Sequence, residues 1–190
     1  MSRVNGLLLA MCLNGVACGV AAQEAYIAAG LGSSNWNFDV CGATGCDRST
    51  SSWRVAAGYR FNRIVAVEGF YFNFGCARSS SVSLDGELCG TALGVQTLLG
   101  YQFGAVDFAG KIGLAGVRSD FRPSVTSFDS AAASRSTELS IGLMGAYRFT
   151  PNLALRLDAD VVTVALNSTG FFYSRGADVT TIMLGLQVRF

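Results

Sequence analysis

The C-terminal stretch "TIMLGLQVRF", residues 181–190, alternates strictly from one residue to the next. One face carries only apolar side chains: Ile182, Leu184, Leu186, Val188 and Phe190. The positions between them are mostly polar or small. A period of two with one wholly apolar face is typical of a β-strand that separates two different environments. The rest of the sequence has to indicate which of the two is water.

Four similar segments, each with a phenylalanine, recur along the chain at a near-constant interval: "GYRFN", "GYQFG", "AYRFT" and the terminal "QVRF". The phenylalanines, Phe61, Phe103, Phe149 and Phe190, are 42, 46 and 41 residues apart. A repeat in which each copy closes a strand indicates four two-stranded units. We therefore expect eight strands, at about residues 24–34, 52–61, 64–74, 91–103, 106–118, 137–149, 153–164 and 179–190.

The links between these strands are of two kinds. After Phe61, Phe103 and Phe149 the links "NR", "GA" and "TPN" are short, which predicts tight hairpin turns. The opposite links are longer, polar and serine-rich. Short turns at one rim and long loops at the other are typical of a bacterial outer-membrane barrel, whose turns are periplasmic and whose loops are extracellular.

The alternation also indicates which face meets lipid. In residues 153–161 the leucines Leu153, Leu155 and Leu157 share one face, while Arg156 and Asp158 share the other. A soluble barrel would turn its apolar face inward and need charge outside. Charged residues are only 14% of the chain, against about 25% in ordinary soluble domains. We therefore expect an eight-stranded antiparallel up-and-down transmembrane β-barrel, with lipid outside and side chains filling the interior.

Aromatic residues recur where the expected strands meet the short turns. They are Tyr59, Tyr101 and Tyr147 with Phe61, Phe103, Phe149 and Phe190. An ordinary core would not confine them to strand ends, so we interpret them as an aromatic belt at the membrane surface. Net charge is +1 without basic runs, which excludes a nucleic-acid partner.

Residues 1–22 have the pattern of a cleaved signal peptide: a basic start, an apolar stretch and small residues before Gln23. The alternative is a lipoprotein signal, because "GVAC" ending at Cys18 loosely resembles a lipobox. Either way the chain is exported. The mature domain is expected to span residues 23–190.

Four cysteines follow the leader: Cys41, Cys46, Cys76 and Cys89. All four lie in stretches that we expect to be loops, and an oxidising compartment favours disulfides. Of three possible connectivities, the local one, 41 with 46 and 76 with 89, needs the least reorganisation of the chain. Zinc is the alternative, but the spacings are not C-x2-C and the chain has no histidine. We expect neither a metal nor a cofactor.

Three internal stretches and the C-terminus carry a family resemblance: "GYRFNRIVAVEGFYFNFG" (58–75), "GKIGLAGVRSD" (110–120), "AYRFTPNLALRLDADV" (146–161) and "LQVRF". Across residues 23–190 the chain resembles the OmpA/OmpX-type small outer-membrane barrels, and the barrel-only members among them. The resemblance implies that Phe190, Val188 and Leu186 form the signal read by the outer-membrane assembly machinery.

The same resemblance implies a charge cluster that plugs the lumen. Glu68 and Arg156 match its inward pair, and Lys111 matches an inward basic residue. Relatives often carry a further carboxylate where this chain has Ala146. Asp158, two residues from Arg156 on the same face, is the expected replacement, and Arg54 is a further cation for the inward carboxylates.

The inward charged residues raise two possible functions, catalysis and conduction. Asp158 and Asp160 share a face and suggest a catalytic carboxylate pair, but pairing with buried cations explains them better. We therefore expect no enzyme. A narrow porin-like channel for small solutes or ions is the other alternative. Glycines such as Gly94 and Gly142 leave room on the lumen face, but conduction would require the charge cluster to act as a gate.

The expected long loops display aromatic and basic residues, as binding loops on rigid scaffolds do. The last holds Phe171, Phe172, Tyr173 and Arg175, and the first holds Trp36 and Phe38. Extension of an outer aromatic belt is the alternative interpretation of these aromatics. Arg118, Arg122 and Arg175 are expected to meet lipopolysaccharide phosphates.

We therefore expect a monomeric, non-enzymatic integral outer-membrane protein. Its barrel would anchor extracellular loops for cell-envelope integrity, or for contact with lipopolysaccharide and host or neighbouring-cell surfaces.

Overall fold

The computed structural model describes residues 24–37, 46–47, 49–81, 84–123, 132–165 and 176–190. Within these ranges no helix is long and apolar enough to cross a membrane. The strands are β1 (Glu24–Asn37), β2 (Cys46–Asp47), β3 (Ser49–Arg60), β4 (Val65–Ser81), β5 (Leu84–Phe103), β6 (Val106–Pro123), β7 (Ala132–Arg148), β8 (Leu153–Ala165) and β9 (Gly176–Arg189).

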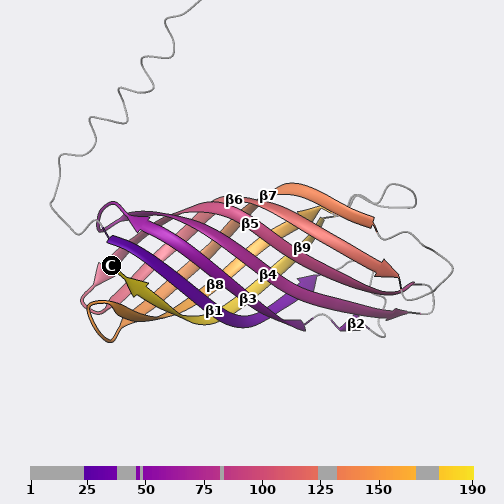
Figure 1. Cartoon of the computed structure of the whole chain (residues 1–190), viewed down its shortest axis with the longest axis horizontal. Helices are drawn as coiled ribbons and strands as arrows, with labels where there is room; N and C mark the ends of the chain where they lie inside the picture. The colour runs from indigo at the N-terminus through magenta and orange to yellow at the C-terminus, as the bar shows by residue number, and fades with distance from the viewer. Residues whose placement is uncertain (1–23, 38–45, 48, 82–83, 124–131, 166–175) are drawn as a thin grey trace, which may run out of the picture.

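Eight of these strands close into an antiparallel barrel, which confirms the predicted fold. Each pairs with its neighbours along the chain, and β1 pairs with β9 from Tyr26 opposite Arg189 to Asn37 opposite Asp178. The tilted strands place the short turns and the C-terminus at one end, the short-turn rim (Figure 1). The short strand β2 lies towards the other end, the long-loop rim (Figure 1).

Side-chain hydrogen bonds close two of the short turns. The side-chain oxygen of Asn62 accepts bonds of 2.8 Å from the backbone nitrogens of both Ile64 and Val65. Thr150 accepts one of 3.0 Å from the nitrogen of Leu153. In the turn between β5 and β6, Gly104 has a φ of +56°, a conformation that glycine adopts without steric cost.

The burial pattern follows the predicted alternation. On β5, for example, Leu93 is 67% exposed and faces outward, while Gln96 is 2% exposed and faces inward. Leucine, isoleucine, valine and aromatic side chains dominate the exposed wall on every barrel strand. Such a continuous apolar surface is not stable in water, whereas the hydrocarbon of a bilayer solvates it. The outer wall therefore meets lipid.

The strands extend further towards the long-loop rim than the sequence indicated. β4 was expected to end near residue 74, but it continues to Ser81. β5 was expected to begin near residue 91, but it begins at Leu84. The prediction that Cys76 and Cys89 lie in a loop is therefore wrong, because both lie in paired strands. Residues 75–81 and 84–90 are mostly small or polar, so the apolar alternation that marks a strand in the sequence fades there.

A bulge at Gly75 sets which way the upper part of β4 faces. The register with β5 shifts between Asn73 and Gly75, where φ is +76°. The side-chain oxygen of Asn73 accepts a 2.9 Å hydrogen bond from the nitrogen of Gly75. The extra residue reverses the alternation, since Phe74 and Ala77 are buried while Cys76 is exposed. Cys76 thereby comes to lie on the outer face.

Regular strand pairing stops at two points towards the long-loop rim. Pairing between β3 and β4 ends at Trp53 opposite Asn73, and pairing between β7 and β8 ends at Ser140 opposite Val162. Beyond these two points, which we call the seams, β3 pairs only with β1, and β7 only with β6, within the described residues. The seam between β3 and β4 is bridged further up, because the Thr50 hydroxyl donates a 2.5 Å bond to the carbonyl of Phe74 and β2 pairs with β4 at Arg78 and Ser79.

The seams begin where the outer wall changes from apolar to polar. On β3 the outward residues change from Trp53 to Ser51, and on β7 from Leu139 to Thr137. Unpaired backbone groups are costly in hydrocarbon but can bind water above it. At both seams the regular pairing therefore stops where the apolar wall ends.

Candidate functional site in the barrel interior

Six charged side chains cross the middle of the lumen, and we call them the central cluster. They stand at inward positions of β3, β4, β6 and β8, because alternation turns every second residue of each strand inward. All are buried. Its members are three cations and three carboxylates: Arg54, Lys111 and Arg156, with Glu68, Asp158 and Asp160.

Glu68 lies at one side of this cluster and is fully buried. Its carboxylate accepts hydrogen bonds of 2.7 and 3.2 Å from the two terminal nitrogens of Arg156. The Tyr26 hydroxyl donates another of 3.0 Å, the amide of Gln96 donates one of 2.9 Å, and Arg54 completes the set with an ion pair. Glu68 therefore joins strands from several sides of the barrel.

The two aspartates of β8 form the other side of the cluster. The Lys111 ammonium donates to Asp158 at 2.6 Å and to Asp160 at 2.8 Å. Arg54 reaches the same two carboxylates at 3.3 and 3.1 Å. Arg156 binds Asp158 through two nitrogens, at 2.8 and 2.9 Å, a geometry that gives strong charge-assisted bonds.

This arrangement accounts for every charge that it buries. Three cations face three carboxylates, so the cluster is neutral, and burial of ions is tolerated only when such pairing is nearly complete. The structure brings together all five residues that the sequence indicated, Glu68, Lys111, Arg156, Asp158 and Arg54. It also adds Asp160 to them. Ala146, where relatives often carry a carboxylate, lies opposite Arg156 in register. Arg156 instead binds Asp158 on its own strand, β8.

Aromatic side chains fill the lumen between the central cluster and the long-loop rim. Phe72 and Phe74 stack with ring centroids 4.6 Å apart, and Trp36 meets Phe74 edge-on at 6.0 Å. Phe70 lies under the Arg54 guanidinium, 5.1 Å from ring centroid to carbon. A side chain on Gly90 would come within 2.6 Å of the Trp36 ring, so glycine there makes room for it.

Trp36 therefore corrects one expectation. It was predicted to be an exposed loop aromatic, but it lies on β1 and is fully buried in this aromatic layer. β1 continues past its expected end, paired with β9, and simple alternation turns Trp36 inward. Phe38, named with it, lies outside the described residues.

A second charged group, which sequence reasoning missed, lies at the short-turn rim. Buried Asp107 forms ion pairs with Arg189, with Arg60 at 3.6 Å and with Arg148 at 4.0 Å. Arg189 also pairs with Glu24 at 3.6 Å. We call these five residues the rim cluster. The signal was present in the alternation, since Asp107 and Arg189 both occupy inward positions near strand ends.

The predicted aromatic belt lies outside this rim cluster. Tyrosine and phenylalanine pair on each strand end, with ring centroids 5.1 Å apart at Tyr59 and Phe61 and 4.7 Å apart at Tyr101 and Phe103. Phe190 is exposed on the same wall, as are Leu186 and Val188 below it. Its backbone nitrogen donates a 3.0 Å bond to the carbonyl of Ala25. This bond attaches the last residue to β1, where the barrel closes.

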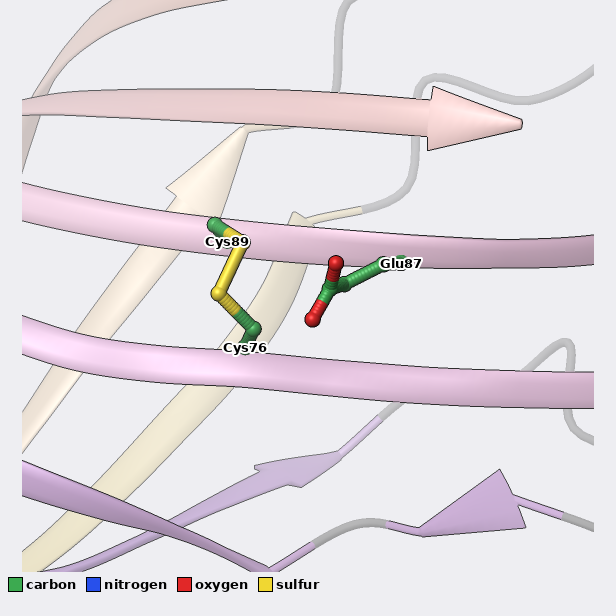
Figure 2. Close-up of side chains that lie close together, drawn as sticks. All are labelled: Cys76, Glu87 and Cys89. Carbon is green, nitrogen blue, oxygen red and sulfur yellow. A yellow bond between two sulfur atoms is a disulfide. The ribbon is translucent and has the colours of Figure 1, made fainter. Parts of the chain in front are cut away.

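A disulfide joins Cys76 of β4 to Cys89 of β5, with their Cα atoms 4.0 Å apart, as predicted. The Glu87 carboxylate lies beside it (Figure 2). Two sulfurs and a carboxylate at this spacing are the donor types of a metal site, but the disulfide occupies both sulfurs. Cys46 forms part of β2, whereas its predicted partner Cys41 lies outside the described residues.

Of the remaining residues predicted to make surface contacts, some lie in a strand and the others lie outside the described residues. Arg118 was the last residue of an expected strand and Arg122 was expected beyond it, but both lie within β6, so the position of Arg122 is a correction of the same kind as that of Cys76. Phe171, Phe172, Tyr173 and Arg175 lie outside the described residues.

An apolar outer wall, an interior of ion-paired side chains and an aromatic belt together define a transmembrane β-barrel. The family model described as "Outer membrane protein beta-barrel domain" matches residues 6–190, and the chain belongs to this family. A comparison with curated protein sequences found no significant match.

Solved structures of other small barrels share the fold. Neisserial surface protein A is 18% identical, with a TM-score of 0.63 over 89% of this chain and 100% of its own. OprG from Pseudomonas aeruginosa is 14% identical, with a TM-score of 0.61 over 90% and 98%. Ail, the attachment invasion locus protein of Yersinia pestis, is 19% identical, with a TM-score of 0.60 over 88% and 99%.

Proposed function

We propose that this protein is a non-enzymatic, monomeric anchor in the outer membrane. Its closed barrel would hold the long-loop rim at the cell surface, for envelope integrity and for contact with lipopolysaccharide or neighbouring surfaces. The observation that carries this proposal is the filling of the lumen at three levels: the aromatic layer, the central cluster and the rim cluster.

Three successive obstructions argue against continuous passage. Opening the central cluster would separate charges that are desolvated and mutually paired, which is costly. Even then the rings of Trp36, Phe72 and Phe74 would still block the lumen on one side. The ion pairs of Asp107 would block it on the other.

The interior also offers little for catalysis. Asp158 and Asp160 each bind Lys111 and Arg54, so both carboxylates are engaged with cations. The chain has no histidine to act as a general base. Ion pairing accounts for these two residues without a reaction.

The proposal also sets the direction of the chain in the membrane. The signal peptide of residues 1–22 would be removed on export, and the mature chain from residue 23 would insert with its short turns in the periplasm. Phe190, Val188 and Leu186 would be read by the assembly machinery. The disulfide between Cys76 and Cys89 supports exposure of the long-loop rim to an oxidising space.

A channel is the second candidate, and one observation favours it. A small cavity borders Arg54 and Arg156 beside Gly30 and Gly185, which face each other across β1 and β9. The cavity gives the arginine side chains space into which they could move. Such movement would open the central cluster without displacing a backbone strand.

Single-channel recording of the refolded mature protein in a planar bilayer separates the two candidates. A heat-dependent shift in gel mobility first establishes that the barrel is folded. We expect a silent bilayer, both for the wild type and for E68Q, because the aromatic layer persists when the central cluster is weakened. Steady conductance of the wild type would refute the closed-barrel proposal.

A further inference from the structure

We propose that the outer wall of the barrel carries a specific site for a phosphorylated, acylated lipid. Arg118 and Arg135 would hold the phosphate, and an apolar groove below them would hold an acyl chain. The inference rests on the proposed function in one respect, since the long-loop rim must face the leaflet that contains the lipid. Lipopolysaccharide supplies such a lipid in its lipid A anchor.

The two arginines form an unusual pair of like charges. Arg118 of β6 and Arg135 of β7 are directly opposite each other in register, and both are exposed on the outer face. Like charges at directly paired positions destabilise a sheet. An anion between them would remove that repulsion, and guanidinium groups fit phosphate in bidentate geometry. The pair is therefore a candidate phosphate clamp.

Only part of this positive charge is neutralised within the described chain. Arg118 contacts the Asp120 carboxylate at 3.3 Å, and both side chains are largely exposed. Arg135 has no ion-pair partner among the residues that the structure describes. A bound phosphate would therefore compete with Asp120 for Arg118 and meet no competitor at Arg135.

The apolar groove begins directly below the clamp. Thr137 and Gly116 line its upper end, and each stands two residues from one arginine on the same outward face. The groove then crosses β5, β4 and β3 to β1, past Leu93, Val95, Gly69 and Ile27. Its lining is almost wholly apolar.

Strand tilt makes this groove descend through the membrane. Thr137 lies far from the short-turn end of β7 at Arg148, whereas Ile27 lies close to the short-turn end of β1 at Glu24. The row of paired residues that joins them therefore runs diagonally from the long-loop rim towards the short-turn rim. An acyl chain in the groove would leave its head group at the two arginines.

The clamp and the groove together fit an amphiphile with an anionic head. A neutral lipid would fill the groove but leave the like-charge pair uncompensated. A soluble anion would satisfy the arginines but leave the groove to bulk lipid. A phosphorylated, acylated lipid satisfies both features at once.

The first experiment measures binding of lipid A to the full mature chain in detergent micelles by native mass spectrometry. Diphosphorylated lipid A, enzymatically dephosphorylated lipid A and phosphatidylcholine are the probes. We expect diphosphorylated lipid A to bind at least tenfold more tightly than the other two. R118Q/R135Q should abolish this preference, while D120N should strengthen it by freeing Arg118. Equal binding of the phosphorylated and dephosphorylated probes would overturn the proposal.

The second experiment tests the groove with two matched leucine substitutions. Gly69 lines the groove, whereas Gly110 is an outward glycine of β6 that does not. An added Cβ would meet only backbone oxygens, at 4.0 Å for Gly69 and 3.8 Å for Gly110, so both sites accept a side chain. We expect G69L to weaken binding of diphosphorylated lipid A several-fold and G110L to leave it unchanged. Equal effects of the two variants would overturn the groove assignment.

Two further results distinguish this proposal from its alternatives. If sedimentation shows a dimer that G69L dissociates, the groove is an interface between two copies and the lipid site is refuted. A conducting barrel that retains phosphate-dependent binding would refute the closed lumen but support the lipid site. A silent barrel with phosphate-independent binding would refute the lipid site alone.

Discussion

Replacing Glu68 by glutamine should destabilise the barrel far more than an exposed charge change does. The substitution keeps the size of the side chain but removes a fully buried carboxylate that binds both Arg54 and Arg156. Removing one partner from a buried ion pair costs about 3–5 kcal/mol, because the other charge stays buried without compensation. We expect E68Q to lie in this range, since Asp158 can still compensate Arg156 in part.

The matched control is R118Q, which removes one charge from an exposed pair. The side chains of Arg118 and Asp120 are 52% and 41% exposed, and exposed pairs contribute about 0–1 kcal/mol. Both variants are compared in phosphatidylcholine vesicles, by urea titration that follows tryptophan fluorescence and gel mobility. A double-mutant cycle of E68Q with R156Q then isolates the pair.

A small loss of stability in E68Q would refute the dry, mutually paired central cluster. If E68Q costs no more than R118Q, the central cluster is hydrated and interchangeable rather than dry and mutually dependent. A coupling energy near zero between Glu68 and Arg156 would lead to the same conclusion. The lumen would then lack a stable obstruction at its centre.

Three other substitutions test separate features of the fold. Replacing Cys76 and Cys89 by serine should leave the barrel heat-modifiable but speed amide exchange in the upper β4–β5 hairpin; loss of the folded gel band would show that the disulfide holds the whole barrel. Phe190→Ala should lower the amount of protein in the outer membrane, as measured by fractionation and immunoblot, because it removes the terminal aromatic of the proposed assembly signal; unchanged amounts would contradict that role. Gly75→Ala should cost about 1–2 kcal/mol or more, since φ is +76° and the new Cβ would collide with the backbone oxygen of Ser51, whereas Gly110→Ala should stay within about 0.5 kcal/mol; similar urea midpoints for the two would argue against the bulge.

The membrane-spanning part of the fold could be predicted because lipid imposes a sharp contrast on each strand. Residues such as Leu157 and Asp158 must face opposite environments, so their order in the sequence already gives their direction. The same contrast placed Arg156 inside with Asp158, whereas Glu68 and Lys111 were placed there by the family resemblance. The contrast also placed Asp107 and Arg189 there, and these could have been recognised by extending the alternation to the strand ends.

The long-loop rim could not be predicted in the same way. Small and polar residues dominate the upper parts of β4 and β5, so the serine-rich stretch around Cys76 has no apolar side to mark it as a strand. A bulge at Gly75 then reverses the direction of every residue that follows it. Trp36 was assigned to the wrong environment for a related reason, because the expected strand ended before the alternation reached it.

The two seams give this protein a fixed depth in the bilayer. Within the described residues they interrupt the β3–β4 and β7–β8 ladders above Trp53 and Ser140, and backbone groups without a strand partner can stay hydrated only while they remain outside the hydrocarbon. A thicker membrane would submerge them, so the barrel would have to tilt, extend its pairing or thin the lipid around it. A thinner membrane would instead leave Leu139 and its apolar neighbours in water. The point where the sheet divides therefore works as a gauge of bilayer thickness, and it matches the protein to one kind of membrane.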